Sequence, residues 1–130
     1  MIVLDASAAL ELLLQTPLGM RVAERALASD ETLHVPYLLD VEVAQVLRRY
    51  TLAGELTAKR AEQALTDFMD LPFTRYAHTD LLLRIWELRN SVTAYDAVYV
   101  ALAEALDAPL VTTDSKLARA HGHRATVLVL

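Results

Sequence analysis

Ile2-Val3-Leu4-Asp5 opens the chain with a short apolar run that ends in a carboxylate. The stretch Leu110-Val111-Thr112-Thr113-Asp114 repeats this arrangement near the other end of the chain. Short, continuous apolar runs are typical of strands covered on both faces, as in parallel sheets. Residues that follow the carboxyl ends of parallel strands meet in one crevice. The two runs therefore predict a parallel α/β sheet with Asp5 and Asp114 at one edge.

The chain between these runs alternates between helical and strand patterns. We expect helices over residues 7–14, 18–28, 38–52, 57–70, 79–89, 93–106 and 115–120. We expect strands over residues 2–4, 32–35, 72–75, 110–112 and 125–129. Thr57 and Thr79 are the expected N-caps of their helices, and Gly54 is the expected end of the helix before it. The alternation predicts one domain, residues 1–130, folded as a three-layer α/β/α sandwich with a short, mainly parallel central sheet.

The composition sets limits on the class of protein. The chain has 130 residues, enough for one domain with a sizeable core. It contains no cysteine, which excludes disulfides and thiolate metal sites and favours a cytoplasmic protein. No apolar run reaches the ~18 residues of a membrane helix, and no signal-peptide pattern precedes the first strand. The apolar fraction is nevertheless 55%, which predicts surface buried in a homodimer or against a partner.

The charge balance bears on nucleic-acid binding. A formal net charge of -5 argues against simple electrostatic attachment to nucleic acid. It does not exclude a metal-dependent nuclease, because bound divalent cations would offset the charge locally. The candidate contacts to an RNA backbone are Arg48, Arg49, Arg89, Lys116 and Arg119.

Two further acids have positions that suggest a site. Asp96 lies near the start of a helix that is apolar nearly all round, so that helix is expected to be buried. Glu42 lies one turn into helix 38–52, at the edge of its apolar stripe, and Asp40 lies at the opposite edge. The periodicity does not choose between Glu42 and Asp40. The residues expected to form that stripe are Leu39, Val43, Val46 and Tyr50.

Each of these residues has a structural explanation when it is taken alone. Asp5 and Asp114 are suitable helix caps, and Asp96 would be stabilised by its helix dipole. Ser7 either caps the helix that begins at Ala8 or holds a metal-bound water or a phosphate. Four acids in one crevice would repel one another, and each would raise its neighbours' pKa. Such a cluster calls for a cation, and a hard divalent metal held by oxygen ligands is the natural candidate.

Four blocks of sequence resemble the PIN domain, and together they cover nearly the whole chain. They are Ile2-Val3-Leu4-Asp5-Ala6-Ser7-Ala8, Pro36 followed by Glu42, Ala94-Tyr95-Asp96-Ala97-Val98-Tyr99-Val100-Ala101-Leu102-Ala103, and Leu110-Val111-Thr112-Thr113-Asp114-Ser115-Lys116-Leu117. Within that family the length is similar to the VapC toxins of toxin-antitoxin pairs.

This resemblance implies a ribonuclease that depends on Mg²⁺, with Mn²⁺ as a substitute, and that a co-expressed VapB-like antitoxin holds inactive. It implies in-line attack by water on an RNA phosphodiester, leaving 5′-phosphate and 3′-hydroxyl ends. Two departures stand out: Gln45 where relatives often have Asn, and Ser115-Lys116 after the last acid. The residues that carry over as metal ligands are Asp5, Glu42, Asp96 and Asp114, with Thr112 and Ser7 as further site residues.

Other functions fit less well. A haloacid-dehalogenase-type phosphatase needs a second Asp two residues after the first, where this chain has Ser7. A response-regulator receiver needs an acidic pair and a phosphoacceptor Asp that are not in place. A catalytically silent PIN-like protein-interaction domain is the remaining alternative, although its acids would be incomplete. The motifs contain no histidine, so surface or packing roles are expected for His34, His78, His121 and His123.

Overall fold

Five strands form one parallel sheet in the computed structural model, which describes residues 1–130. The strands are β1 (Ile2–Leu4), β2 (Leu33–Pro36), β3 (Phe73–Tyr76), β4 (Leu110–Thr112) and β5 (Val127–Val129). Their order is β3-β2-β1-β4-β5, and every neighbouring pair is parallel. The direction of winding therefore reverses between β1 and β4. The carboxyl ends of these two strands flank the switch point at which open α/β sheets bind ligands.

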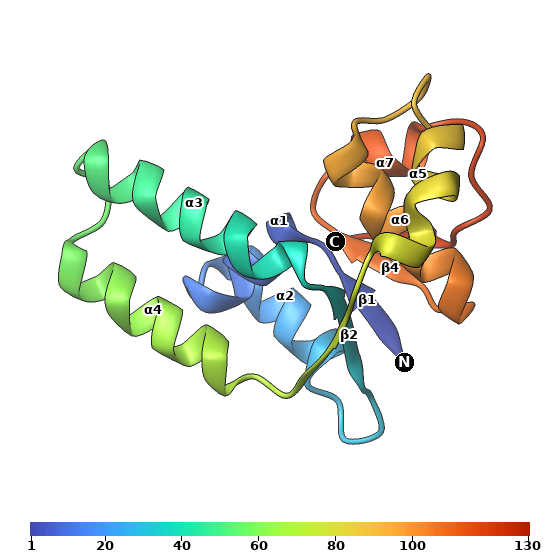
Figure 1. Cartoon of the computed structure of the whole chain (residues 1–130). Helices are drawn as coiled ribbons and strands as arrows, with labels where there is room; N and C mark the ends of the chain where they lie inside the picture. The colour runs from blue at the N-terminus through green and yellow to red at the C-terminus, as the bar shows by residue number, and fades with distance from the viewer.

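The helices divide into two layers around this sheet (Figure 1). One layer contains α1 (Ala6–Leu13), α2 (Pro17–Ala26), α3 (Leu38–Leu52) and α4 (Ala58–Asp70). The other contains the 3₁₀ turn η1 (Thr79–Leu81), α5 (Leu82–Glu87), α6 (Ala94–Leu106) and α7 (Ser115–Arg119). Right-handed crossovers produce this division, because the chain winds one way from β1 to β3 and the other way to β4 and β5. The three-layer prediction is confirmed.

The core lies under the three central strands. β1, β2 and β4 are buried along their whole length, whereas β3 and β5 at the edges are partly exposed. The expectation of strands covered on both faces therefore holds only for the centre of the sheet. Helix α6 crosses β1, β2 and β4, which explains why seven consecutive residues, 97–103, are buried.

Some local expectations need correction. Thr57 does cap α4, with its hydroxyl accepting from the Arg60 amide at 3.1 Å. Thr79 is no cap, because it lies inside η1 and the preceding His78 makes no capping bond. The buried row of α3 is Leu39, Val43 and Leu47, each four residues from the next. Val46 and Tyr50, assigned to the buried stripe from the sequence, lie instead on the flank of that row and are only partly buried.

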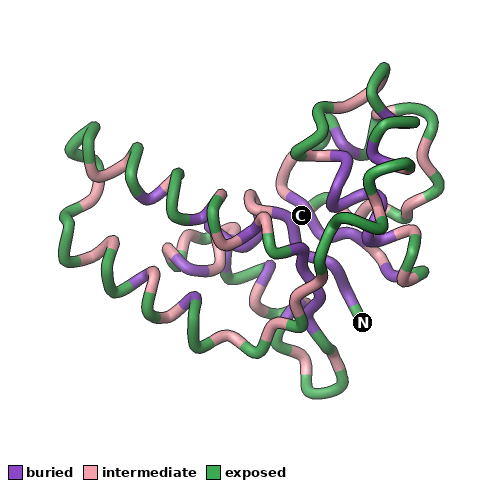
Figure 2. The backbone as a smooth tube through the Cα atoms, viewed as in Figure 1, coloured by how far each residue is buried: buried purple, intermediate pink, exposed green.

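Helices α3 and α4 project from the body of the molecule as a hairpin (Figure 1). Exposed residues predominate at its outer end, while the central strands are buried (Figure 2). Gly54 makes the turn with φ of +75°, a conformation that suits glycine. The projection leaves both flanks of α3 open to other molecules. None of the helices combines the length and apolarity that crossing a lipid bilayer requires.

Candidate active site

Asp5 is held at the end of β1 by three hydrogen-bond donors. It is only 6% exposed, and it caps α1 by accepting from the Ala8 amide at 2.9 Å. The Ser7 hydroxyl donates to the same carboxylate oxygen at 2.6 Å. The Thr112 hydroxyl, fully buried at the end of β4, donates to the other oxygen. Burial raises the pKa of Asp5. The three donors lower that pKa, and the charge of the nearby Asp96 raises it.

Ser7 and Thr112 act as positioning groups for Asp5. Each hydroxyl has one proton, and both protons point to the Asp5 carboxylate. The 3.2 Å contact between the two hydroxyl oxygens therefore carries no hydrogen bond of its own. Both oxygens also accept from the backbone after β4, Ser7 from the Thr113 amide and Thr112 from the Asp114 amide. The alternative that Ser7 caps α1 is wrong, since Asp5 is the cap.

Glu42 reaches the same region from α3. Its carboxylate accepts a 2.5 Å hydrogen bond from the hydroxyl of Tyr99, which lies on α6 and is 1% exposed. Burial and the nearby Asp96 and Asp5 raise the pKa of Glu42, although the bond from Tyr99 lowers it. The pKa of Tyr99 is raised well above its ordinary value by burial, by its bond to Glu42 and by the surrounding acids. Tyr99 therefore remains a neutral donor.

Asp96 and Asp114 complete the group. Asp96 lies in the first turn of α6, and its amide donates to the Thr93 hydroxyl at 3.2 Å. Burial and then the charge of Asp114 raise the pKa of Asp96, while Thr93 and Lys116 lower it. Asp114 caps α7 by accepting from the Lys116 amide at 2.9 Å. The charge of Asp96 acts on Asp5 and Glu42, and the charge of Asp114 acts on Asp96, so the four acids lie in one region. This region, made of Asp5, Glu42, Asp96 and Asp114, is called here the carboxylate cluster.

No ion pair reaches the carboxylate cluster. The ion pairs of the molecule involve Glu31, Asp40, Glu87 and Glu104 instead. Asp40 and Glu42 differ in this respect. Asp40 pairs with Arg75 on β3 at 2.9 Å, while Glu42 faces the cluster.

The donor set of the cluster consists of carboxylate and hydroxyl oxygens, which suits a hard divalent cation such as Mg²⁺. Burial is the main cause of the raised pKa of Asp5, Glu42 and Asp96, and a cation would relieve the repulsion that adds to it. No three acidic or histidine side chains are close enough together to enclose an ion as they stand. Holding an ion would therefore require these side chains to draw closer.

The basic candidates are scattered over the molecule. Lys116 is close enough to lower the pKa of Asp96, and Arg49 lines a groove beside Glu42. Arg48 is among the residues that line a groove between α3 and α4, and Arg89 stacks on Trp86 at 4.8 Å. Arg119 is exposed at the end of α7.

The histidines lie outside the cluster, as expected. His34 on β2 is buried and bonded to the Tyr76 hydroxyl at 2.7 Å and to the Thr32 hydroxyl at 2.8 Å. His123 bonds the Leu117 carbonyl at 3.1 Å. His78 and His121 are exposed.

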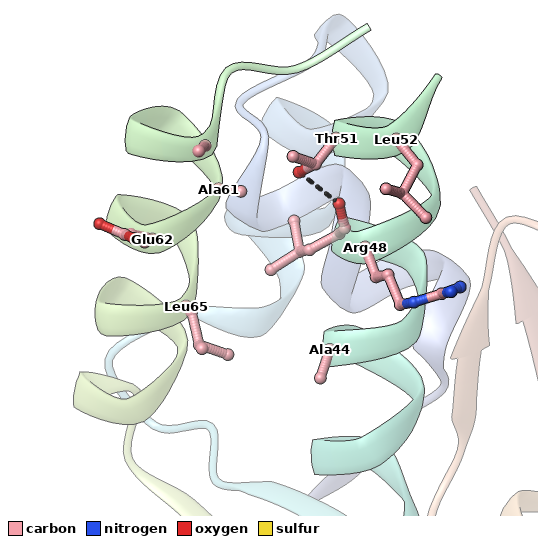
Figure 3. A pocket seen from close by; sticks show the side chains of 9 residues that line it. Ala44, Arg48, Thr51, Leu52, Ala61, Glu62 and Leu65 are labelled. Atoms are coloured by element: carbon pink, nitrogen blue, oxygen red, sulfur yellow. Dashed lines mark hydrogen bonds between the residues drawn. The ribbon is translucent and has the colours of Figure 1, made fainter. Parts of the chain in front are cut away.

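Two grooves follow the flanks of α3. The first, the α3–α4 groove, is mainly apolar (Figure 3), and its lining is Ala44, Leu47, Arg48, Thr51, Leu52, Ala58, Ala61, Glu62 and Leu65. The second, the Tyr95 groove, lies between the starts of α1 and α6 and the opposite flank of α3. Its lining is Ala6, Leu38, Val41, Glu42, Gln45, Val46, Arg49 and Tyr95. Because Glu42 lines it, the Tyr95 groove opens onto the carboxylate cluster.

Sequence reasoning missed the role of Tyr99. A signal was present, because a buried tyrosine needs an acceptor for its hydroxyl. Tyr99 also lies three residues after Asp96, which places both on one face of α6.

Comparison with known protein sequences agrees with this geometry. A sequence model of the PIN domain family matches residues 2–122. Ribonuclease VapC12 of Mycobacterium tuberculosis is 42% identical over 98% of this chain and 97% of its own length. Ribonuclease VapC9 of the same species is 48% identical over 90% of this chain and 88% of its own.

Solved structures share the fold at lower sequence identity. VapBC2 from Rickettsia felis, solved bound to a DNA fragment from its promoter, superposes with a TM-score of 0.73 and 16% identity, covering 99% of this chain and 98% of that one. PAE2754 from Pyrobaculum aerophilum gives a TM-score of 0.70 and 24% identity, covering 97% and 82%. At these identities the likeness shows the fold alone.

Proposed function

This chain belongs to the PIN domain family and is a relative of the VapC ribonucleases, and from that premise we propose that it is an endoribonuclease toxin. The reaction is hydrolysis of RNA phosphodiester bonds, and a VapB-like antitoxin neutralises it. The observation that carries the proposal is the carboxylate cluster. All four acids are present near the switch point of the sheet, and none of them forms an ion pair. A protein-interaction domain without activity has no need to keep such a cluster.

Asp5, Glu42, Asp96 and Asp114 would hold Mg²⁺ or Mn²⁺. The bound ion would supply a more acidic water as nucleophile and would stabilise the charge on the phosphate. The chain's own contribution is to position the carboxylates. Asp5 is fixed by Ser7 and Thr112, and Glu42 is fixed by Tyr99. These donors are neutral, so they orient the acids without cancelling their charge.

We place the antitoxin on the α3–α4 groove. Its apolar lining suits an amphipathic segment that inserts apolar anchors between two helices. The groove would also bury part of the apolar surplus of the chain. An Arg or Lys of the antitoxin that reached the carboxylate cluster would take the place of the metal's charge. The apolar surplus also supports a homodimer. The absence of cysteine suits a protein that acts in the cytoplasm.

Cleavage of RNA by purified protein tests the proposal. We expect cleavage with Mg²⁺ or Mn²⁺, none with excess chelator, and none for Asp96→Asn. The matched control is Asp107→Asn, which makes the same change at the opposite end of α6. Asp107 is exposed and has φ of +50°, a conformation that Asn tolerates. Cleavage that persisted in chelator, or that Asp107→Asn abolished equally, would contradict the proposal.

A further inference from the structure

We infer that the Tyr95 groove is the subsite that binds a nucleotide next to the scissile phosphate, with a base stacked on Tyr95. The inference rests on the proposed ribonuclease function and specifies where the RNA lies. The groove has a volume of about 400 Å³, within the range of small-ligand sites. A nucleotide in it would lie beside Glu42, which belongs to the carboxylate cluster.

Tyr95 supplies the stacking surface. It is 63% exposed although it lies in the first turn of α6, whose residues 97–103 are buried, and its hydroxyl bonds no other residue. Base stacking on an exposed aromatic ring is a common way of holding single-stranded nucleic acid, because every base offers a π face. Tyr95 directly precedes Asp96 in the sequence, so the stacking surface and one acid of the cluster lie on neighbouring residues.

Arg49 and Gln45 supply the polar contacts. Both are exposed on the flank of α3 that also bears Glu42, and neither side chain has an ion-pair or hydrogen-bond partner within the chain. A free guanidinium suits a phosphate, and an amide has the donor and acceptor needed to bond a base edge. Val41 and Val46 add apolar surface to the lining of the groove. Stacking surface, cation and amide together match a nucleotide.

The two flanks of α3 differ in a way that separates RNA from protein. The α3–α4 groove is lined mainly by Ala and Leu side chains and lies away from the carboxylate cluster. The Tyr95 groove combines an aromatic ring and Arg49 with direct access to Glu42. Arg48 and Arg49 are adjacent in sequence yet line opposite grooves.

The binding test uses a single-stranded RNA hexanucleotide that contains one 2-aminopurine, titrated with Asp96→Asn protein in Mg²⁺ so that no cleavage occurs. Stacking quenches 2-aminopurine fluorescence. We therefore expect quenching by the Asp96→Asn protein that keeps Tyr95 and by the one that also carries Tyr95→Phe. Tyr95→Leu keeps apolar bulk but loses the ring, and it should abolish the quenching and weaken binding about tenfold. Arg49→Ala should weaken binding severalfold, whereas Arg21→Ala, the same change at an exposed arginine on α2, should leave it unchanged. Thermal melts verify that each variant folds.

A kinetic test in the otherwise unchanged protein gives an independent readout. Loss of a contact made equally in ground and transition states raises KM and leaves kcat unchanged, which we expect for Tyr95→Leu. Equal RNA binding and quenching by Tyr95 and Tyr95→Leu would overturn the subsite, even if the enzyme cleaves RNA normally. If Tyr95→Leu left RNA binding unchanged but converted a dimer to a monomer, the groove would be the contact surface for a second copy of the chain. That result would also overturn the subsite. Quenching that depends on Tyr95, without cleavage by the unsubstituted protein, would support the subsite and refute the ribonuclease function.

Discussion

The hydrogen bond from Tyr99 to Glu42 offers a test that separates positioning of the carboxylate cluster from its chemistry. Tyr99 is 1% exposed and its hydroxyl bonds Glu42 at 2.5 Å. Glu42→Ala would leave that hydroxyl buried without a partner, and an unsatisfied buried group costs about 1–3 kcal/mol. Removing the Glu42 charge also relieves repulsion from Asp5 and Asp96, which offsets part of this cost. We therefore expect Glu42→Ala to lose about 1–2 kcal/mol of unfolding free energy in chelator.

Glu42→Gln keeps an acceptor for Tyr99 and removes the charge. The neutral bond is weaker by about 1 kcal/mol, and relief of the repulsion acts in the opposite direction. We expect the metal-free stability to stay within about 0.5 kcal/mol of the original protein. RNA cleavage should nevertheless be lost, because the amide is a poor ligand for a divalent cation. A stable but inactive Glu42→Gln would assign the charge of Glu42 to function.

Urea denaturation in chelator, with Tyr99→Phe and the double variant added, completes a double-mutant cycle. With a slope of about 1–2 kcal/mol per molar urea, Glu42→Ala should lower the midpoint by about 1 M. Replacing both partners by apolar groups costs less than the sum of the single changes, giving a coupling of about 1–2 kcal/mol. Glu24→Ala, an exposed acid on α2, controls for loss of a surface carboxylate. The reasoning would be refuted if the losses of unfolding free energy from the two single changes simply added in the double variant. It would also be refuted if Glu42→Ala were as stable as Glu24→Ala.

Three other outcomes follow from the site. Asp96→Asn should raise the melting temperature of metal-free protein at pH 7. Burial and the charge of Asp114 raise the pKa of Asp96 in the folded protein. Ionised Asp96 therefore destabilises the fold; this loss of stability is absent below the ordinary carboxyl pKa and grows as the pH rises from that value through the raised pKa. The gain from Asp96→Asn should therefore shrink as pH falls toward 4, and thermal melts at several pH values would contradict this if the gain were constant. MgCl₂ should raise the melting temperature of the original protein more than that of Asp5→Asn, since an ion that binds only the folded state stabilises it; equal shifts would remove Asp5 from the ligand set. Ala44→Glu, an exposed change in the α3–α4 groove, should weaken antitoxin binding in a pull-down and leave RNA cleavage intact, and unchanged antitoxin binding would count against that groove.

The sequence predicts the parts of the site that depend on chain topology. Asp5 and Asp114 each follow an apolar run, and the parallel register of β1 with β4 brings the two strand ends together. The general rule for parallel sheets is sufficient for that inference. The prediction of helix α3 over residues 38–52 is likewise confirmed at both ends, because its apolar period is strong and Gly54 ends it.

Tertiary contacts decide what the periodicity of α3 left open. Asp40 and Glu42 lie two residues apart, at opposite edges of the expected stripe. Arg75 from β3 neutralises Asp40, and Tyr99 from α6 bonds Glu42. Both partners come from distant segments, so no local pattern in α3 distinguishes the two acids. The same holds for Ser7, whose contacts with Thr112 and Thr113 span more than 100 residues of sequence.

The kind of partner that each acid has is more informative than its position. Outside the cluster, Glu31, Asp40 and Glu104 meet cationic groups. Inside the cluster, the donors are hydroxyls and backbone amides: Ser7, Thr112 and Ala8 on Asp5, Tyr99 on Glu42, and the Lys116 amide on Asp114. Such donors fix the direction of a carboxylate but leave its full charge in place. Burial and, after it, mutual repulsion raise the pKa of Asp5, Glu42 and Asp96. A cation that bound among these carboxylates would offset the resulting cost in stability, as the proposed metal does.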